Sequence, residues 1–258
     1  MFHVKQYCLI GYPLSHSLSP LIHKKIVDIL GLKINYLLMP CKEIDINSLK
    51  EFDGFNVTMP HKETIIPYLD NITETAKNIH SVNTVKVEEG KFIGHSTDGE
   101  GFIRDFFRVF NTDFYNKNIC ILGTGATSRA ISDKIRKQCP KNIYYLSRSK
   151  EGKNIFPYNQ RDIIKDCQII INTTPTGMYD DNCLLDENDI NENMLVYDVI
   201  YNKKTPLISL SERANAKAQG GFGMLIYQAV LAWEHWEINC LYKKNIDKII
   251  REVINEKE

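Results

Sequence analysis

The feature that most constrains the fold of this chain is an alternation of short apolar runs with helix-like segments, which begins near residue 6 and begins again near residue 118. Alternating strands and helices are typical of α/β proteins with a mostly parallel sheet, because each helix carries the chain back to the same edge. The first series consists of predicted strands over 6–12, 34–40 and 54–60, predicted helices over 19–30, 61–69 and 74–81, and a weak helix over 45–52.

Local signals fix several boundaries in this first series. Ser19 as N-cap and Pro20 at the first helical position predict the start of a helix that Gly31 ends. A hairpin is predicted to turn at Glu89-Gly90, and a helix is predicted over 99–110. The polar stretch at 111–113 then separates the two series.

The second series predicts another α/β layer. A strand that ends in a glycine turn and a helix covers 118–138, three further strands follow over 142–149, 166–175 and 194–202, and two amphipathic helices close the chain over 224–240 and 243–257. One economical topology returns these helices to the first layer. We therefore expect two domains, residues 1–98 with 225–258 and residues 99–224.

Composition excludes several classes of partner. The 32 basic and 32 acidic residues cancel, so no overall field favours nucleic acid or an anionic membrane. No apolar run reaches the roughly 20 residues of a membrane span, and the N-terminus does not have the pattern of a signal peptide. The 7 cysteines have no paired spacing, which indicates reduced thiols rather than disulfides or a metal site. A cytoplasmic protein is expected, as a monomer or a homodimer.

The glycine turn after the strand at 119–122 is the first candidate binding site. Gly123-Thr124-Gly125 is followed by Ala126, Thr127 and Ser128 at the start of a helix. This strand–turn–helix context is the one that a dinucleotide-binding, Rossmann-like domain requires, because the glycines allow the pyrophosphate to approach the helix N-terminus. A glycine turn that only joins two packed elements is an equally good interpretation of this motif alone.

The end of the next strand favours NADP over NAD. An acidic residue would accept the ribose 2′-hydroxyl of NAD at this spacing, but the chain has Ser147, Arg148 and Ser149 there. A guanidinium flanked by hydroxyls suits a 2′-phosphate, since arginine binds phosphate through parallel charge-assisted hydrogen bonds.

Polar residues also follow the predicted strands of the first series, where α/β folds bind ligands. Ser15 and Ser17 precede a helix N-terminus and could hold a carboxylate. The other polar residues in such positions are Asn56, Thr58, Lys62, Asn83 and Asp98. Each alone is also explained by turn chemistry.

Taken in order, these segments resemble the shikimate dehydrogenase family. The motifs are S-x-S-x-S-P from Ser15, N-V-T-x-P-x-K from Asn56, V-N-T from Val82, T-D-G from Thr97, G-x-G from Gly123, N-T-T-P-x-G-M from Asn172 and G-x-G-M-L-x-x-Q from Gly221. The resemblance extends from about Gly11 to Gln228. Where the family usually has G-x-G-G-A and N-R-T, this chain has G-T-G-A-T and S-R-S, which keep the residues small or polar.

The resemblance implies reversible NADPH-dependent reduction of 3-dehydroshikimate to shikimate, in aromatic amino-acid biosynthesis. It implies that Ser15 and Ser17 hold the substrate carboxylate. The ring hydroxyls and carbonyl would be held by Thr58, Asn83, Asp98, Tyr201 and Gln228. The coenzyme would lie against Gly123, Gly125 and Ala126 at its pyrophosphate and against Thr173, Val199, Gly221 and Met224 at its nicotinamide.

Lys62 and Asp98 are the predicted catalytic residues. When hydride reaches the carbonyl carbon, the oxygen needs a proton, which a lysine ammonium can supply. A neighbouring carboxylate stabilises that ammonium, so we interpret the two as one proton-sharing unit, in which either residue could carry the proton. His16 and His61 occupy variable positions of the motifs, and no metal-ligand spacing is present.

Three other functions stay open at this point. A shikimate/quinate dehydrogenase that accepts both polyols or uses NAD is the nearest alternative. A folate-type methylene dehydrogenase shares the two-domain layout but not the paired serines. A catalytically silent sensor of a nucleotide or metabolite is the alternative from another class.

Overall fold

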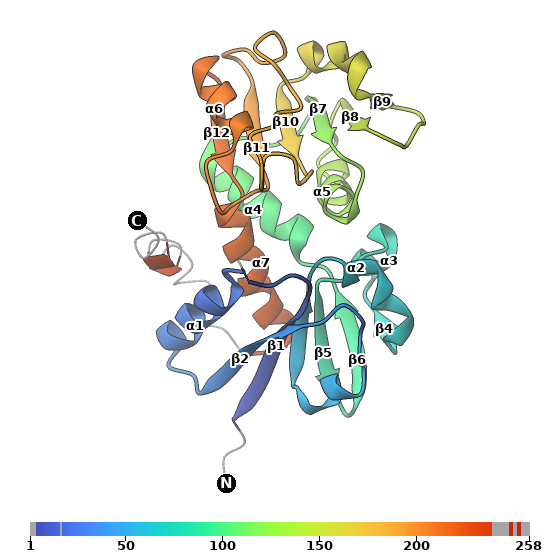
Figure 1. The fold of residues 1–258 in the computed structure, drawn as a ribbon, viewed down its shortest axis with the longest axis vertical. Coiled ribbons are helices and arrows are strands. Elements are labelled where there is room, and N and C mark those ends of the chain that lie inside the picture. The colour runs from blue at the N-terminus through green and yellow to red at the C-terminus, as the bar shows by residue number, and fades with distance from the viewer. Residues whose placement is uncertain (1–3, 16, 239–247, 250–251, 254–258) are drawn as a thin grey trace. The chain divides into compact units, whose positions relative to one another are not determined.

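The structure is a computed structural model that describes residues 4–15, 17–238, 248–249 and 252–253 (Figure 1). Its internal contacts divide the chain into two compact units, Met1–Asp98 with Ile226–Glu258, and Gly99–Leu225. Each unit contains a six-stranded sheet with helices beside it. The predicted α/β class is therefore confirmed.

The sheet of the first unit is mixed, with the order β2-β1-β3-β5-β6-β4. Strand β1 is parallel to both β2 and β3, β5 is antiparallel to β3 and β6, and β4 is parallel to β6. The strands are β1 (Lys5–Gly11), β2 (Ile34–Pro40), β3 (Gly54–Val57), β4 (Asn71–Ile72), β5 (Thr84–Glu88) and β6 (Lys91–His95). The predicted hairpin is β5–β6, and Glu89 and Gly90 both have the positive φ of a two-residue type I′ turn.

Helix α1 (Ser19–Leu30) ends as predicted at Gly31, whose φ of 64° is left-handed. Its start differs from the prediction that Ser19 is the N-cap. Ser19 is already helical, and its backbone N–H is 3.3 Å from Ser17 Oγ, which accepts from it. The other short helices of this unit are η1 (Ser48–Glu51), α2 (His61–Thr64), η2 (Ile66–Tyr68) and α3 (Glu74–Ile79).

The C-terminal helix α7 (Phe222–His235) leads back into the core of the first unit. Trp233 and Trp236 are buried, and both rings pack against Tyr7 of β1. Trp236 Nε1 donates to the Val85 carbonyl oxygen at 2.9 Å. The two tryptophans are therefore core residues. The second predicted C-terminal helix, over 243–257, lies mostly outside the described residues. Cys240 also lies outside them.

The sheet of the second unit is parallel throughout, with the order β12-β11-β10-β7-β8-β9. Counted from β7, this is the order 3-2-1-4-5-6 of doubly wound dinucleotide-binding sheets. The strands are β7 (Asn118–Leu122), β8 (Asn142–Ser147), β9 (Ile155–Pro157), β10 (Ile169–Asn172), β11 (Leu195–Asp198) and β12 (Lys217–Gly220). The helices are α4 (Asp98–Phe110), α5 (Ala126–Arg136), η3 (Tyr158–Asp166) and α6 (Pro206–Arg213).

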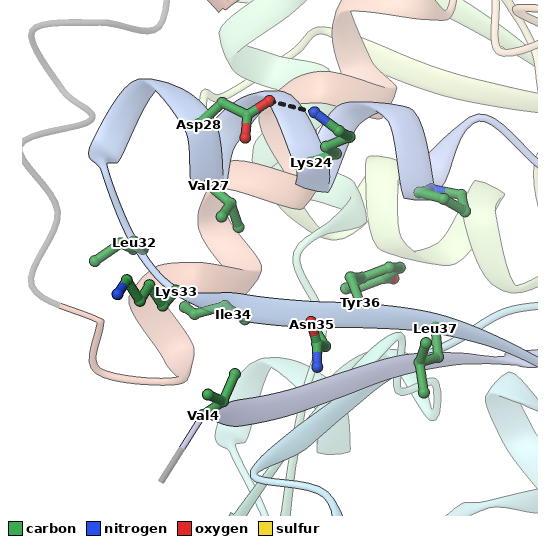
Figure 2. Close-up of a pocket in the computed structure, with 11 residues that line it drawn as sticks. Val4, Lys24, Val27, Asp28, Leu32, Lys33, Ile34, Asn35, Tyr36 and Leu37 are labelled. Carbon is green, nitrogen blue, oxygen red and sulfur yellow. Dashed lines mark hydrogen bonds and ion pairs between the residues drawn. The ribbon is translucent and has the colours of Figure 1, made fainter. Parts of the chain in front are cut away.

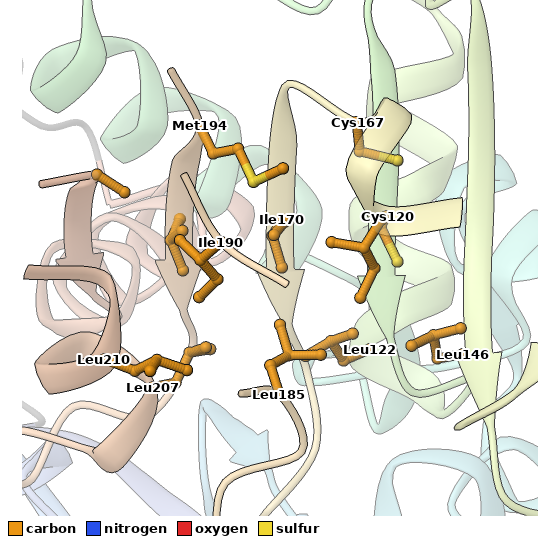
Figure 3. Packing of buried hydrophobic residues seen from close by; sticks show 13 residues of the cluster. Cys120, Leu122, Leu146, Cys167, Ile170, Leu185, Ile190, Met194, Leu207 and Leu210 are labelled. Atoms are coloured by element: carbon orange, nitrogen blue, oxygen red, sulfur yellow. The ribbon is translucent and has the colours of Figure 1, made fainter. Parts of the chain in front are cut away.

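Both faces of this second sheet are covered, which explains why its central strands β7 and β10 carry apolar residues on both faces over 119–122 and 169–171. In β7, Cys120 and Leu122 belong to one core cluster, with α6 and η3 (Figure 3). Ile119 and Ile121 belong to the cluster on the other face, with α4 and α5. Cys8 and Cys120 are fully buried among apolar residues, each in its own unit, and both are free thiols.

Among the described residues, no helix combines the length and apolar character needed to cross a membrane. The same part of the chain contains no group of three histidine, cysteine or acidic side chains placed to hold a metal ion.

Candidate active site

The polar residues predicted in the first unit gather at one edge of its sheet. The loop after β1, the loop after β3 and the segment after β6 leave the sheet at the ends of three strands that point the same way. Asn83 lies at the same edge, because it precedes β5, which runs in the opposite direction. This topology brings Lys62, Asn83 and Asp98 together from three separate segments.

Lys62 and Asp98 form an ion pair. Lys62 lies in the single turn of α2, Asp98 is the first residue of α4, and Lys62 Nζ is 2.6 Å from Asp98 Oδ2. The Lys62 side chain is 21% exposed and the Asp98 side chain 7%. The lysine backbone is also fixed, because its carbonyl oxygen accepts from Val82 N at 2.8 Å. The pair thus combines a buried carboxylate with an ammonium that keeps some access to solvent.

Asn83 holds the other carboxylate oxygen of Asp98. Its Nδ2 donates to Asp98 Oδ1 at 2.8 Å and to Thr97 Oγ1 at 2.8 Å, and its Oδ1 accepts from Thr97 N at 2.8 Å. Asn83 and Thr97 are buried. The side chain of Asn83 therefore ties the end of β6 to the start of β5 and fixes the direction in which Asp98 points.

Gln228 reaches the same cluster from α7. Its Oε1 lies 3.2 Å from Asn83 Nδ2, across a sequence separation of 145 residues. Thr58 lies where β3 ends, and its backbone N–H donates to the Ile10 carbonyl oxygen at 2.9 Å. A Cβ on Gly11 would be 2.4 Å from the Thr58 methyl group, so this approach of β1 to the loop after β3 requires glycine.

The two predicted carboxylate-binding serines differ in their surroundings. Ser15 is exposed in the loop between β1 and α1. Ser17 is half-buried, and its hydroxyl accepts from the start of α1. Residue 16, the histidine between them, lies outside the described residues. His61 is buried, with its Nε2 2.9 Å from the Cys41 carbonyl oxygen, which is a structural contact.

In the second unit, the glycine turn follows β7 as predicted. Gly123 has φ of +101°, and a Cβ there would lie 2.9 Å from Thr173 Oγ1. Gly125 is exposed, and a Cβ on it would meet no atom within 4 Å. It is the N-cap of α5 and gives that helix no side-chain cap, so the first backbone N–H groups have no partner from this position. The turn therefore offers a ligand open space at a positive helix end.

Behind this turn lies a buried hydroxyl without a partner. Ser128 is 1% exposed, and its Oγ makes no hydrogen bond among the described residues. Ala126 and Thr127, in the first turn of the same helix, are half-buried. An uncapped helix end with unpaired backbone donors suits a phosphate-bearing ligand, such as the pyrophosphate of a dinucleotide.

The segment after β8 is organised by Ser147. Its Oγ accepts from the backbone N–H groups of Ser149 and Lys150, and it lies 3.4 Å from Thr124 Oγ1. Arg148 and Ser149 are exposed. Ser147 itself is 5% exposed, so its hydroxyl shapes the loop, while the guanidinium of Arg148 is free to meet solvent or ligand.

The residues predicted beside the nicotinamide lie after β10 and β11 and at the start of α7. Thr173 Oγ1 donates to the Leu122 carbonyl oxygen at 2.7 Å, and Val199 N donates to the Asn172 carbonyl oxygen at 3.0 Å. A Cβ on Gly221 would lie 2.2 Å from the Val199 carbonyl oxygen. Met224 is 7% exposed and belongs to the apolar core, so any contact with a ligand could come only from a small part of its surface.

Tyr201 follows β11 and is half-buried. Burial raises the pKa of its phenol, with a further contribution from Tyr179. The hydroxyl therefore stays protonated at neutral pH and can donate a hydrogen bond.

The sequence profile of the shikimate dehydrogenase substrate binding domain matches residues 9–85. The shikimate dehydrogenase (NADP+) of Methanococcus maripaludis is 36% identical to this chain, over 96% of each. The chain belongs to the shikimate dehydrogenase family. The family predicted from the sequence motifs is therefore confirmed.

Solved structures of family members share the fold. A shikimate dehydrogenase in complex with NADP+ is 32% identical, with a TM-score of 0.89, and the match covers 100% of this chain and 98% of the other. A shikimate 5-dehydrogenase of Thermus thermophilus in complex with NADP(H) and shikimate is 25% identical, with a TM-score of 0.85 and coverage of 96% and 99%.

Sequence reasoning missed several residues that hold the predicted ones in place. Asp198 is buried and accepts from Asn172 Nδ2 at 3.0 Å and from Thr205 Oγ1 at 2.7 Å. Burial raises the pKa of its carboxyl, although all of its partners act in the other direction. These bonds fix the loops that carry Thr173 and Val199. An acid at the end of a buried strand was the signal that could have found Asp198.

Proposed function

We propose that this protein is an NADP-dependent shikimate dehydrogenase, which reduces 3-dehydroshikimate to shikimate reversibly, a step of aromatic amino-acid biosynthesis. The observation that supports it most directly is the Lys62–Asp98 ion pair, held by Asn83 beside Gln228, in a chain of this family. Reduction of a carbonyl needs a proton donor held in position. A hydroxylated ring also needs polar groups beside that donor to bind it.

Lys62 is the proton donor in this proposal. NADPH, when bound, supplies the hydride that reaches the carbonyl carbon. The ammonium of Lys62 gives a proton to the oxygen as its negative charge develops, and takes the proton back in the oxidation direction. Asp98 orients the ammonium through Oδ2 and stabilises its charge. The two residues act as one proton-transfer unit.

The remaining predicted polar residues bind the substrate. Ser15 and Ser17 hold its carboxylate near the N-terminus of α1, where the helix dipole favours negative charge. The ring hydroxyls and the carbonyl are held by Thr58, Asn83, Asp98, Tyr201 and Gln228. The protonated phenol of Tyr201 and the amide of Gln228 offer donors to a hydroxyl-rich ring. The NH2 group of Asn83 already donates to Thr97 and Asp98, so Asn83 acts mainly by fixing Asp98.

The coenzyme belongs to the second unit. Its pyrophosphate would be held at the uncapped N-terminus of α5 by Gly123, Gly125, Ala126 and Thr127. Arg148 binds the 2′-phosphate, with Ser147 and Ser149 beside it. Thr173, Val199, Gly221 and Met224 line the nicotinamide side. The parallel order of the second sheet, which places these loops along its carboxyl edge, supports this arrangement.

We assign residues 1–98 and 225–258 to the substrate domain and residues 99–224 to the NADP-binding domain. An enzyme that spends NADPH on biosynthesis is expected in the cytoplasm, and either a monomer or a homodimer is compatible with its chemistry.

A four-way assay tests the proposal. Purified protein is given shikimate or quinate with NADP+ or NAD+, and reduced nicotinamide is followed by its absorbance. We expect turnover to be fastest with shikimate and NADP+. Equal rates with quinate would change the substrate to the wider class of polyols, and faster turnover with NAD+ would overturn the role of Arg148. No turnover with any pair would favour a catalytically silent sensor.

A further inference from the structure

We propose that Tyr36 is a positioning residue for the Lys62–Asp98 pair and acts on it through Asn56 and Asn83. None of the sequence motifs contains Tyr36, which lies on β2 at the edge of the first sheet. The inference deepens the proposed function, on which its catalytic part rests. It is carried by a continuous series of hydrogen bonds within the first unit.

The first link joins Tyr36 to Asn56. The Tyr36 hydroxyl lies 2.8 Å from Asn56 Oδ1, and Asn56 is 4% exposed. Figure 2 shows Tyr36 on the side of β2 that faces α1, at the hollow that these two elements form. There its ring stacks on the buried imidazole of His23, with centroids 3.8 Å apart and planes inclined by 11°. The phenol is thus held in one orientation.

The direction of this hydrogen bond follows from its neighbours. Asn56 faces Tyr36 on one side and the Asn83 carbonyl oxygen, at 3.2 Å from its Nδ2, on the other. A carbonyl oxygen can only accept, so Asn56 must present its NH2 group to Asn83 and its oxygen to Tyr36. Tyr36 must then donate. Burial raises the pKa of Tyr36 well above its usual range, so the proton needed for this is present.

The second link joins Asn56 to the catalytic pair. The Asn83 carbonyl oxygen accepts from both Asn56 Nδ2 and Val57 N, which fixes the Asn83 backbone against β3. The Asn83 side chain in turn donates to Asp98 Oδ1, whose carboxylate holds Lys62 on its other oxygen. If Tyr36 loses its hydroxyl, Asn56 Oδ1 loses its donor and the amide is held only through its bond to the Asn83 carbonyl oxygen. The Asn56 side chain is then less firmly fixed, and so are Asn83 and, through it, Asp98.

Packing alone is the alternative explanation of Tyr36, and it makes a different prediction. A tyrosine that serves only the core stabilises the fold through its ring, so removal of its hydroxyl alone should leave turnover unchanged. A positioning residue changes turnover when its hydroxyl alone is removed, because small displacements of catalytic groups slow the reaction strongly.

Tyr36→Phe removes the hydroxyl and keeps the stacking on His23. We expect kcat for shikimate oxidation to fall about 10-fold, as loss of one hydrogen bond of roughly 1.4 kcal/mol implies, with KM changed less than about 2-fold. Tyr7→Phe is the matched control, since Tyr7 is the direct cross-strand neighbour of Tyr36 and is buried against Trp233 and Trp236. It should leave kcat unchanged.

A double-mutant cycle tests the route. In an Asn56→Ala background the hydroxyl of Tyr36 has no amide to orient, so Tyr36→Phe should lower kcat no further. An unchanged kcat in Tyr36→Phe, an equal fall in Tyr7→Phe, or the same 10-fold fall in the Asn56→Ala background would each overturn the proposal.

A measurement without turnover separates this inference from the proposed function. In nitrogen-15 spectra of the free protein, Tyr36→Phe should shift the side-chain NH2 signals of Asn83, whereas Tyr7→Phe should not. Absence of that shift would overturn the connection even in an active enzyme. If Tyr36→Phe causes the shift but the wild-type protein oxidises neither shikimate nor quinate, the proposed function and the catalytic role of Tyr36 are both refuted. Only the structural connection between Tyr36 and Asn83 would then remain.

Discussion

Asp98 holds Lys62 with one carboxylate oxygen only, at 2.6 Å from Nζ, while its other oxygen is occupied by Asn83. The carboxylate therefore cannot rotate away from the lysine without giving up a buried amide donor. An ammonium anchored in this way keeps one direction in space and still has protons to give. This asymmetry distinguishes the pair from the exposed ion pairs elsewhere in the chain, such as Lys77–Glu74.

Replacement of Lys62 by alanine should reduce turnover rather than substrate affinity. We expect kcat to fall by about 10²–10⁴-fold, the range for loss of a general acid–base group, with little change in KM for shikimate. Lys77→Ala removes an exposed lysine from the same unit and should behave like the wild type. Steady-state kinetics check both. If KM alone rises in Lys62→Ala, Lys62 binds substrate and does not transfer the proton.

Replacement of Arg148 by alanine should weaken the use of NADP+ selectively. Loss of charge-assisted hydrogen bonds to the 2′-phosphate is expected to raise KM for NADP+ by about 10–100-fold and to leave KM for NAD+ unchanged. Arg136→Ala is a suitable control, since this arginine of the same unit donates to the Tyr145 hydroxyl on the surface. An Arg148→Ala enzyme that uses NADPH as well as the wild type would remove Arg148 from the coenzyme site.

The two glycines of the turn should respond differently to alanine. Gly123→Ala forces a side chain onto a φ of +101° and within 2.9 Å of Thr173 Oγ1, so we expect a loss of stability of about 1–3 kcal/mol. Gly125 has φ of −79° and free space around it, so Gly125→Ala should fold normally. It should instead raise KM for NADP+, because the methyl group occupies the space left for the pyrophosphate. Denaturant unfolding combined with kinetics tests the pair, and normal coenzyme affinity in Gly125→Ala would contradict this site.

His23 should make the stability of the protein depend on acid. Burial lowers the pKa of His23 to about 3 from an ordinary value of 6.5, and neither ring nitrogen has a hydrogen-bond partner among the described residues. As pH falls below about 6.5, the unfolded chain takes up the proton and the folded protein does not. Above that pH, His23 does not lower the free energy of unfolding. Below it, the free energy of unfolding falls by about 1.4 kcal/mol for each pH unit, down to the pKa of His23 in the folded protein.

The variant His23→Phe removes this term and keeps an aromatic ring against Tyr36. We expect the free energy of unfolding to fall by about 1.4 kcal/mol less in the variant than in the wild type between pH 7.5 and pH 5.5. Urea unfolding at the two pH values measures the difference. Identical pH dependence in both proteins would mean that His23 is protonated in the folded state.

Local sequence determined most of the elements of this protein. Short apolar runs and the punctuation by glycine and proline placed β2, α1 and the β5–β6 hairpin close to their observed bounds, because such signals depend on neighbours in the chain. Spaced motifs also identified the family before any geometry was known. The short strands β4, β9 and β12 escaped, since two to four residues carry too little periodicity.

Tertiary structure alone decided how the candidate site is assembled. Lys62 and Asp98 are 36 residues apart, and Asn83 and Gln228 are 145 residues apart, so only strand order and helix packing can make them neighbours. At the start of α1, the hydroxyl that accepts from the helix is that of Ser17 and not that of Ser19, since backbone conformation, not residue type, selects it. The predicted catalytic pair, Lys62 and Asp98, came from motifs. Its 2.6 Å contact, and the amide that fixes one side of the carboxylate, came from the fold, because periodicity records which residues are buried and not which of them meet.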